Sequence, residues 1–183
     1  MSLTLRQQLA ARRGHISAQN RALAREAVSH RLIELINKNG YTKVAVYLAI
    51  KDELSLAPLI TWLLANKCQV YAPKIDLPEP GAMQFFPLLP SGTMETANFG
   101  LSEPAATGTP IEPQKLELVC VPMLGFHQLN RIGWGKGYYD RCFAFRRTHK
   151  PPPLLAGVAF AAQQEPKIQA QPWDVAMDVI YCS

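Results

Sequence analysis

Lys43-Val-Ala-Val-Tyr-Leu-Ala-Ile50 is an almost wholly apolar run of β-favouring residues. A strand that is apolar on both sides of its pleat is typical of a parallel sheet covered by helices on both faces. Residues 56–65 have a helical pattern, and Cys68-Gln-Val-Tyr-Ala72 is expected to be a second strand, ending at Pro73. Together these segments predict a strand–helix–strand unit with parallel strands and a right-handed crossover.

The same alternation continues on both sides of this unit. Helical patterns cover residues 3–37, with Ser17 as the cap of a second helix and Asn39-Gly40 at its end. Further strands are expected at residues 83–89, 116–121, 154–160 and 179–181, and a helix at 138–148. Residues 90–113, rich in Gly, Pro, Ser and Thr, are expected to be mostly loop. We therefore predict one α/β domain over residues 1–183, a sandwich around a mostly parallel sheet.

Composition limits the classes of protein to consider. With 183 residues, 48% hydrophobic and 18% charged, the chain is expected to fold around a substantial core. The four cysteines lack zinc or redox spacing, no apolar run is long enough to span a membrane, and the first residues lack the core of a signal peptide. A cytoplasmic protein with reduced cysteines is expected. The net charge of +5 fits an anionic partner, whether nucleic acid, nucleotide or polycarboxylate.

An early group of arginines contributes to this charge. Its members are Arg6, Arg12, Arg13, Arg21 and Arg25. We interpret most of them as a solvated helix face.

Three polar or glycine-rich segments follow predicted strands. They are Lys51-Asp52-Glu53, Lys74-Ile75-Asp76 and residues 123–137. Ligands of open α/β sheets bind beyond the carboxyl ends of the strands. The three segments are therefore expected to meet in one crevice.

The third segment leads into Asn130-Arg-Ile-Gly-Trp-Gly-Lys-Gly-Tyr-Tyr-Asp-Arg141. Alternate glycines let backbone N–H groups approach an anion closely, and Lys136 and Arg131 add positive charge for phosphate oxygens. The spacing fits neither a Walker A loop nor a dinucleotide fingerprint. The alternative is a glycine-rich turn that serves only geometry.

The segment from Arg131 to Arg141 resembles the signature of 5-formyltetrahydrofolate cyclo-ligases, also called methenyltetrahydrofolate synthetases. Fragments similar to the family pattern occur in order along the chain: Leu5 to Leu9, Tyr47-Leu48 with Asp52-Glu53, Val70-Tyr71-x-Pro73, Phe99 to Pro104, and Trp173 to Asp178. The resemblance implies a ligase that closes 5-formyltetrahydrofolate to 5,10-methenyltetrahydrofolate with ATP and Mg²⁺, releasing ADP and phosphate. It also implies a Rossmann-like three-layer sandwich, similar to the sugar-phosphate isomerase and CoA-transferase group.

The resemblance implies roles for particular residues. Arg131, Lys136 and Tyr139 are the expected catalytic residues, and Asp140 and Asp174 the expected Mg²⁺ ligands. The folate would contact Tyr47, Leu48, Glu53 and Phe99, with Glu53 accepting hydrogen bonds from the pterin ring. ATP would contact Arg6, Arg131, Ile132, Gly133, Trp134, Gly135, Lys136, Gly137, Tyr138 and Tyr139.

Each of these residues also has a structural interpretation. Asp140 is placed to cap a helix or to interact with its dipole, and Asp174 to be a surface or capping carboxylate. Arg6 has the pattern of an exposed helix arginine, and Glu53 that of an acid before a helix. Tyr47, Leu48 and Phe99 are residue types that are often simply core.

Three positions differ from the family pattern. Residues 126–130 are one residue shorter than usual, with His127 where an aspartate is common, and this changes the entry to the phosphate loop. Ser2 replaces a lysine, and Ile75 replaces an aromatic residue. Two other functions stay open: an ATP-dependent enzyme of this fold on another substrate, and a non-catalytic binder of nucleotide, folate or RNA. The expected partners are ATP and a reduced folate, without nucleic acid or membrane, in a monomer or weak homodimer.

Overall fold

The computed structural model describes residues 3–75, 79, 81–89, 94–96, 102–104 and 108–183. Its centre is a six-stranded sheet in the order β10-β9-β6-β1-β2-β3. The strands are β1 (Lys43–Ala45), β2 (Gln69–Lys74), β3 (Gln84–Pro87), β6 (Leu118–Pro122), β9 (Leu154–Ala159) and β10 (Val179–Cys182). All neighbours are parallel except β3, which runs antiparallel to β2. The predicted mostly parallel sheet is confirmed.

The strand order reverses direction at β1. From β1 the chain crosses to β2 on one side, and later returns to β6 on the other side. Such a reversal separates the loops that leave the two neighbouring strands, and opens a crevice at their carboxyl ends. The loops after β1 and β6 therefore flank the place where a ligand site is expected.

The helices are α1 (Leu5–Gly14), α2 (Ala18–Asn39), α3 (Ala57–Ala65) and α4 (Tyr138–Cys142). A capping box between Thr4 and Gln7 starts α1. Ser17 accepts a hydrogen bond from Asn20 N at the start of α2, and Gly40 ends α2 in the left-handed conformation. Both of these predicted helix boundaries are confirmed.

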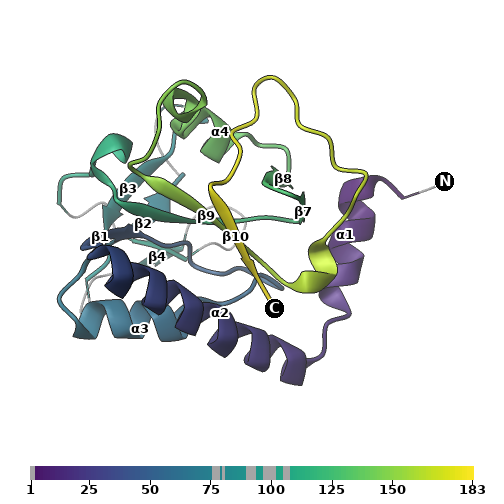
Figure 1. Cartoon of the computed structure of the whole chain (residues 1–183), viewed down its shortest axis with the longest axis horizontal. Helices are drawn as coiled ribbons and strands as arrows, with labels where there is room; N and C mark the ends of the chain where they lie inside the picture. Colours follow the sequence, from purple (N-terminus) through teal and green to yellow (C-terminus); the bar gives the residue numbers. More distant parts are fainter. Residues whose placement is uncertain (1–2, 76–78, 80, 90–93, 97–101, 105–107) are drawn as a thin grey trace.

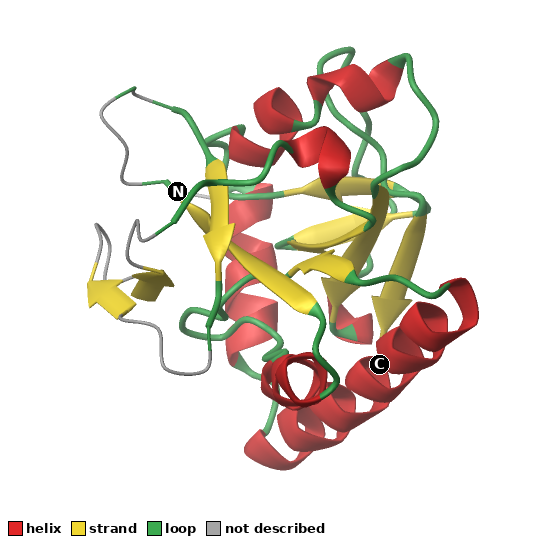
Figure 2. Ribbon diagram, turned by 90° about the vertical axis from the view of Figure 1, so that its left-hand side faces the viewer, coloured by secondary structure: helices red, strands yellow, loops and turns green. Residues whose placement is uncertain are grey.

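The layers form a three-layer α/β sandwich (Figures 1 and 2). Helices α2 and α3 cover one face of the sheet, and α4 lies over the other. Side chains alternate along the strands: Val44 and Cys120 pack with α2 and α3, whereas Ala45, Val119 and Val121 pack with Phe143 beyond α4. Burial on both faces explains the continuous apolar runs in the sequence.

Several predicted boundaries were wrong. The first strand ends at Ala45 rather than at residue 50, although Val46 N still donates to Tyr71 O at 2.9 Å. The second strand continues through Pro73 to Lys74. Its pairing with β1 ends at Tyr71, so the hydrogen bonds between these two strands need no N–H from Pro73. The expected loop at residues 90–113 contains a hairpin of β4 (Met94–Thr96) and β5 (Ser102–Pro104).

The helix expected at residues 138–148 was also too long. Helix α4 ends at Cys142 and is followed by a short 3₁₀ turn, Ala144–Arg147. Within the described part of the chain, every helix is too short or too polar to cross a bilayer. The expected likeness to the sugar-phosphate isomerase and CoA-transferase group stays a prediction.

Candidate active site

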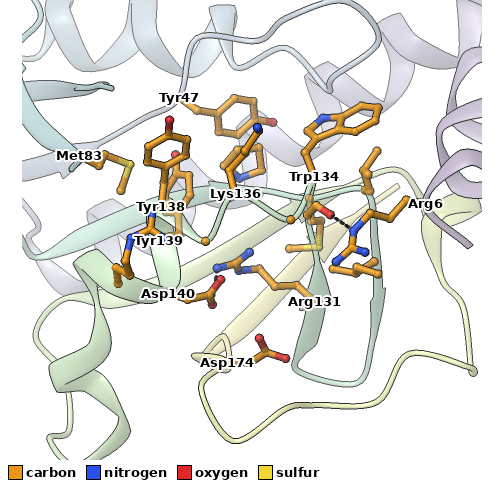
Figure 3. Close-up of a pocket in the computed structure, with 18 of the residues that line it drawn as sticks. Arg6, Tyr47, Met83, Arg131, Trp134, Lys136, Tyr138, Tyr139, Asp140 and Asp174 are labelled. Atoms are coloured by element: carbon orange, nitrogen blue, oxygen red, sulfur yellow. Dashed lines mark hydrogen bonds and ion pairs between the residues drawn. The ribbon is translucent and has the colours of Figure 1, made fainter. Parts of the chain in front are cut away.

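A cavity of about 1190 Å³ lies at the carboxyl ends of the strands, between the loops that follow β1 and β6 (Figure 3). Its walls come from residues 47–53, 122–124, 131–141 and 167–174, with Leu5 and Arg6 of α1. It is larger than the pocket of a single drug-sized ligand. Every described residue that we assigned to ATP, folate or Mg²⁺ lines this cavity. Phe99 lies outside the described residues.

The shortened entry to the phosphate loop forms a tight hairpin. Strands β7 (Gly125–His127) and β8 (Asn130–Ile132) pair antiparallel, and Gln128 and Leu129 make the turn. Gln128 adopts a positive φ of 53°, which closes so short a turn. Leu129 O accepts Met177 N at 2.9 Å, fixing the hairpin tip to the segment before β10. The segment that enters the phosphate loop is therefore a hairpin with a two-residue turn.

Residues 133–137 form an open loop between β8 and α4. Gly135 and Gly137 have φ values of 85° and 67°, a region that side chains rarely adopt. At Gly137 an added Cβ would also lie 2.7 Å from Arg141 Nη1. Arg6 Nε donates to Gly133 O at 2.9 Å, which ties this loop to α1. Arg6 therefore binds the backbone of the loop and is not a purely solvated arginine.

Lys136 sits between the two left-handed glycines and is exposed. None of the residues that the structure describes forms an ion pair or hydrogen bond with its ammonium group. Its position in the cavity wall leaves the charge available to an anion (Figure 3). Trp134, 51% exposed, lines the same cavity and presents its ring to any ligand there.

Arg131 is held in a fixed orientation from two sides. Its Nη2 donates to Asp140 Oδ1 at 2.8 Å, and the two side chains are only 7% and 19% exposed. Its Cζ lies 5.7 Å from the centre of the Tyr139 ring. Asp140 Oδ1 also accepts Val175 N at 3.2 Å. No side chain caps α4, so Asp140 is not its N-cap, but it lies in the first turn of the helix, where a carboxylate interacts favourably with the helix dipole.

Two tyrosines begin α4. Burial raises the pKa of Tyr139, and its ring stacks on Phe143 at 6.4 Å, so that the phenol is neutral at ordinary pH. The Tyr138 ring lies 5.5 Å from Arg141 Cζ. Arg141 in turn donates to Gly81 O at 2.9 Å. These contacts hold the start of α4 against the cavity.

Asp174 combines a local and a cavity-facing role. Its Oδ2 accepts Gln171 N at 2.8 Å, as expected of a turn-capping carboxylate, while the residue lines the same cavity as Asp140. The described residues contain no group of three or more His, Cys, Asp or Glu side chains that could hold a metal. A metal here would therefore need ligands from a bound molecule or water in addition to these carboxylates.

Residues at the end of β1 and in the loop after it line another part of the cavity. Tyr47, 3% exposed, donates its hydroxyl to Leu54 O at 2.5 Å, and burial raises its pKa. Glu53 Oε2 accepts Ile50 N at 3.1 Å. Burial raises the pKa of Glu53, while the Ile50 N–H and the charge of Arg13 oppose the rise. Helix α3 begins at Ala57 without a side-chain cap, so Glu53 does not act as its helix-start acid.

Arg13 differs from the solvated face expected for most of the early arginines. It is only 3% exposed, whereas a solvated face was expected. It follows Leu5 and Leu9 at helical spacing, so it lies on the apolar side of α1. That spacing was the available signal, and the cluster of neighbouring arginines obscured it.

Comparison with known proteins agrees with the resemblance seen in the glycine loop. The sequence model of the 5-formyltetrahydrofolate cyclo-ligase family matches residues 2–183. The 5-formyltetrahydrofolate cyclo-ligase of Haemophilus influenzae is 26% identical over 167 residues, 90% of this chain and 88% of that protein. That of Mycoplasma pneumoniae is 25% identical over 179 residues, 96% and 94% of the two chains. The NMR structure of Aquifex aeolicus 5,10-methenyltetrahydrofolate synthetase has a TM-score of 0.81 at 27% identity, covering 97% of this chain and 87% of that one.

Proposed function

This chain belongs to the 5-formyltetrahydrofolate cyclo-ligase family, and we propose that it is the ligase that closes 5-formyltetrahydrofolate to 5,10-methenyltetrahydrofolate while ATP becomes ADP and phosphate. The observation that carries the proposal is the single cavity that unites the glycine loop, Lys136 and Glu53. Its volume of about 1190 Å³ suits two ligands bound together, as a transfer between ATP and folate requires.

The reaction needs activation of a poor leaving group. The formyl oxygen attacks the γ-phosphorus in line, and ADP leaves. N10 of the folate then attacks the activated formyl carbon, phosphate leaves with the former formyl oxygen, and N10 loses its proton. The enzyme must therefore align the γ-phosphate with the formyl oxygen and stabilise the charge that develops.

The glycine loop supplies the groups for this task. The backbone of residues 132–137 and the side chain of Lys136 would bind the phosphates, with Lys136 as a charge on the transferring group. Arg131, held by Asp140 and Tyr139, would present its remaining N–H groups without reorganising. Arg6 would keep the loop in place, Trp134 would contact the nucleotide, and Tyr138 and Tyr139 would shape the site.

Glu53 would bind the folate ring in the part of the cavity that Tyr47 and Leu48 also line. A carboxylate can accept two hydrogen bonds from the adjacent amino and ring N–H groups of a 2-amino-4-oxo heterocycle. Tyr47 and Leu48 would supply the apolar wall beside it, and Phe99 the remaining stacking surface.

Magnesium fits the residues at the phosphate end. Asp140 uses one carboxylate oxygen for Arg131 and Val175 N, and Asp174 lines the same space. Mg²⁺ is usually bound by one or two carboxylates together with substrate phosphates and water, so a preformed protein cluster is not required. When bound, the ion would neutralise phosphate charge.

The test is an assay of purified protein with 5-formyltetrahydrofolate, ATP and Mg²⁺. We expect methenyltetrahydrofolate and ADP to form in equal amounts, and neither to form without ATP. No product above a no-enzyme control would refute the proposal. Turnover of ATP with another acceptor, but none with the folate, would assign this cavity to a different reaction of the same fold.

A further inference from the structure

The three tryptophans of the chain have different surroundings. Trp62, in α3, packs against the hydrophobic core. Trp134 and Trp173 are 51% and 62% exposed, and both line the cavity. Trp134 belongs to the glycine loop, whereas Trp173 lies in the distant segment 167–174. None of the described residues stacks on the Trp173 ring or accepts a hydrogen bond from its indole N–H, so both are available to a ligand.

Trp173 is carried by a hydrogen-bonded turn. Asp174 N donates to Gln171 O at 3.0 Å, which closes a β-turn over residues 171–174. Pro172 stands at the second position of this turn, where its fixed φ favours the turn conformation. Gln171 N donates to Asp174 Oδ2 at 2.8 Å, and Arg147 Nη1 donates to Trp173 O at 2.9 Å. The backbone that carries the ring is therefore fixed, while the ring itself stays exposed.

The turn is attached to the phosphate end of the cavity. Val175, the residue after the turn, donates its N–H to Asp140 Oδ1 at 3.2 Å. The same oxygen accepts Arg131 Nη2 at 2.8 Å. Two hydrogen bonds therefore link the turn to an arginine that is expected to bind phosphate, and Trp173 lies at the border of that site.

The residues expected at the folate ring lie elsewhere in the cavity. Tyr47 and Glu53 come from the end of β1 and the loop after it. Figure 3 shows Tyr47 and Asp174 on opposite sides of Arg131. Because Trp173 directly precedes Asp174, its ring is placed for the nucleotide rather than for the pterin.

We propose that the Trp173 indole is the stacking surface for the adenine base of ATP. This inference rests on the proposed function, which assigns the phosphates of ATP to the glycine loop. Adenine offers a flat π-face, and stacking of a base on an aromatic side chain stabilises a complex. Only the ribose separates the base from the phosphates, so a stacking surface at the border of the phosphate end suits a nucleotide whose phosphates are held there. The loop with Lys136 would then bind one part of ATP, and the turn with Trp173 the other.

Exposure alone does not carry this inference. Single exposed apolar side chains are common on protein surfaces, and Leu23 on α2 is also 62% exposed. Trp173 differs from Leu23 because it lines the cavity and because three hydrogen bonds hold its turn. Leu23 lies outside the cavity wall, so it is a matched control for the loss of an exposed apolar side chain.

The experiment measures equilibrium binding by calorimetry, with Mg²⁺ present, of three ligands: ATP, inorganic triphosphate and 5-formyltetrahydrofolate. Trp173→Ala should weaken the Kd for ATP roughly ten-fold. The Kd for triphosphate, which has no base, and the Kd for the folate should not change. Trp173→Phe keeps an aromatic ring and should retain most of the ATP affinity. Leu23→Ala should leave all three Kd values unchanged.

Three results would overturn the inference. The first is an unchanged Kd for ATP in Trp173→Ala. The second is an equal loss for triphosphate, which would show that the substitution acts on the phosphates through the turn. The third is a loss confined to the folate, which would assign the ring to that substrate.

A second variant keeps the test decisive where triphosphate binds too weakly to measure. Trp173→Leu keeps an apolar side chain without a π-face, so it should lose as much ATP affinity as Trp173→Ala. Wild-type affinity in Trp173→Leu would show that stacking is not used, and would overturn the inference. Failure of the unchanged protein to bind ATP would instead overturn the proposed function.

Discussion

The phosphate end of the cavity presents backbone groups and an exposed lysine from one continuous segment, residues 131–140, whereas the folate end presents less exposed side chains from the end of β1 and the loop after it. At the first end Lys136 has no partner among the described residues, and left-handed glycines set the shape. At the second, Tyr47 is buried, and burial raises the pKa of Glu53. Substitutions should therefore affect turnover at one end, and substrate affinity and its pH dependence at the other.

Lys136→Ala should have the largest effect and would test whether the phosphate end governs turnover. We expect kcat/KM to fall by about 10²- to 10³-fold, because a charge aimed at the developing transition state is removed. The melting temperature should not change, since the side chain is exposed and without a partner among the described residues. Steady-state kinetics and thermal unfolding measure both quantities. Lys38→Ala, at the exposed end of α2, is the control, and equal kinetics for the two variants would contradict the assignment.

Glu53→Gln should act at the folate end with a smaller effect. A hydrogen bond to a charged group contributes about 1.5–3 kcal/mol, so the KM for 5-formyltetrahydrofolate should rise by about ten- to a hundred-fold. The KM for ATP should change little, because the nucleotide contacts lie at the other end. Glu112→Gln, which alters an exposed glutamate paired with Lys115, serves as the control. A parallel rise in both KM values would show that the two ends are not separable.

Gly137→Ala should combine strain with a local clash. The left-handed backbone costs about 1–2 kcal/mol with a side chain, and the new Cβ would displace Arg141 from its place at 2.7 Å. Gly40→Ala is a matched control, since Gly40 has the same φ of 67° with nothing within 4 Å and lies outside the cavity wall. Both variants should lose stability in denaturant unfolding, Gly137→Ala somewhat more because Arg141 must move, and only Gly137→Ala should also raise the KM for ATP. An unchanged KM would mean that the loop shape is not needed for the nucleotide.

Gln128→Gly should have the smallest effect, in the favourable direction. Glycine adopts a positive φ of 53° without strain. Relief of the strain should exceed the cost of the greater conformational entropy of the unfolded chain, and the free energy of unfolding should rise by about 0.5 kcal/mol. Unfolding in urea would detect it, with Lys67→Gly, at φ of 58°, as a comparison. The kinetics should not change, because the turn is needed only for the shape of the hairpin. A change in the KM for ATP would show that the turn also adjusts the phosphate loop.

The two ends also differ in how far the sequence predicted them. The phosphate loop is a local pattern of glycines and charges, and all of its described residues line the cavity as expected. The folate end required tertiary information: Glu53 lines the cavity, but its role stays a prediction, and the burial of Arg13 in α1 was not foreseen. Strand lengths were misjudged for a related reason, because β1 ends at Ala45 while its neighbours β2 and β6 continue to Lys74 and Pro122, and the apolar residues after Ala45 do not show this.

By itself, the amino-acid sequence determined the alternation of helices and strands, the glycine loop and the family, since each depends on residue type and spacing along the chain. The tertiary structure alone decided that the shortened entry becomes a hairpin, that Arg131 pairs with Asp140, and that Arg13 is buried. The physical reason is that burial and charge pairing depend on which elements pack together. The side chains of α1 and the loop after β1 meet only when the sheet brings the ends of its strands to one edge.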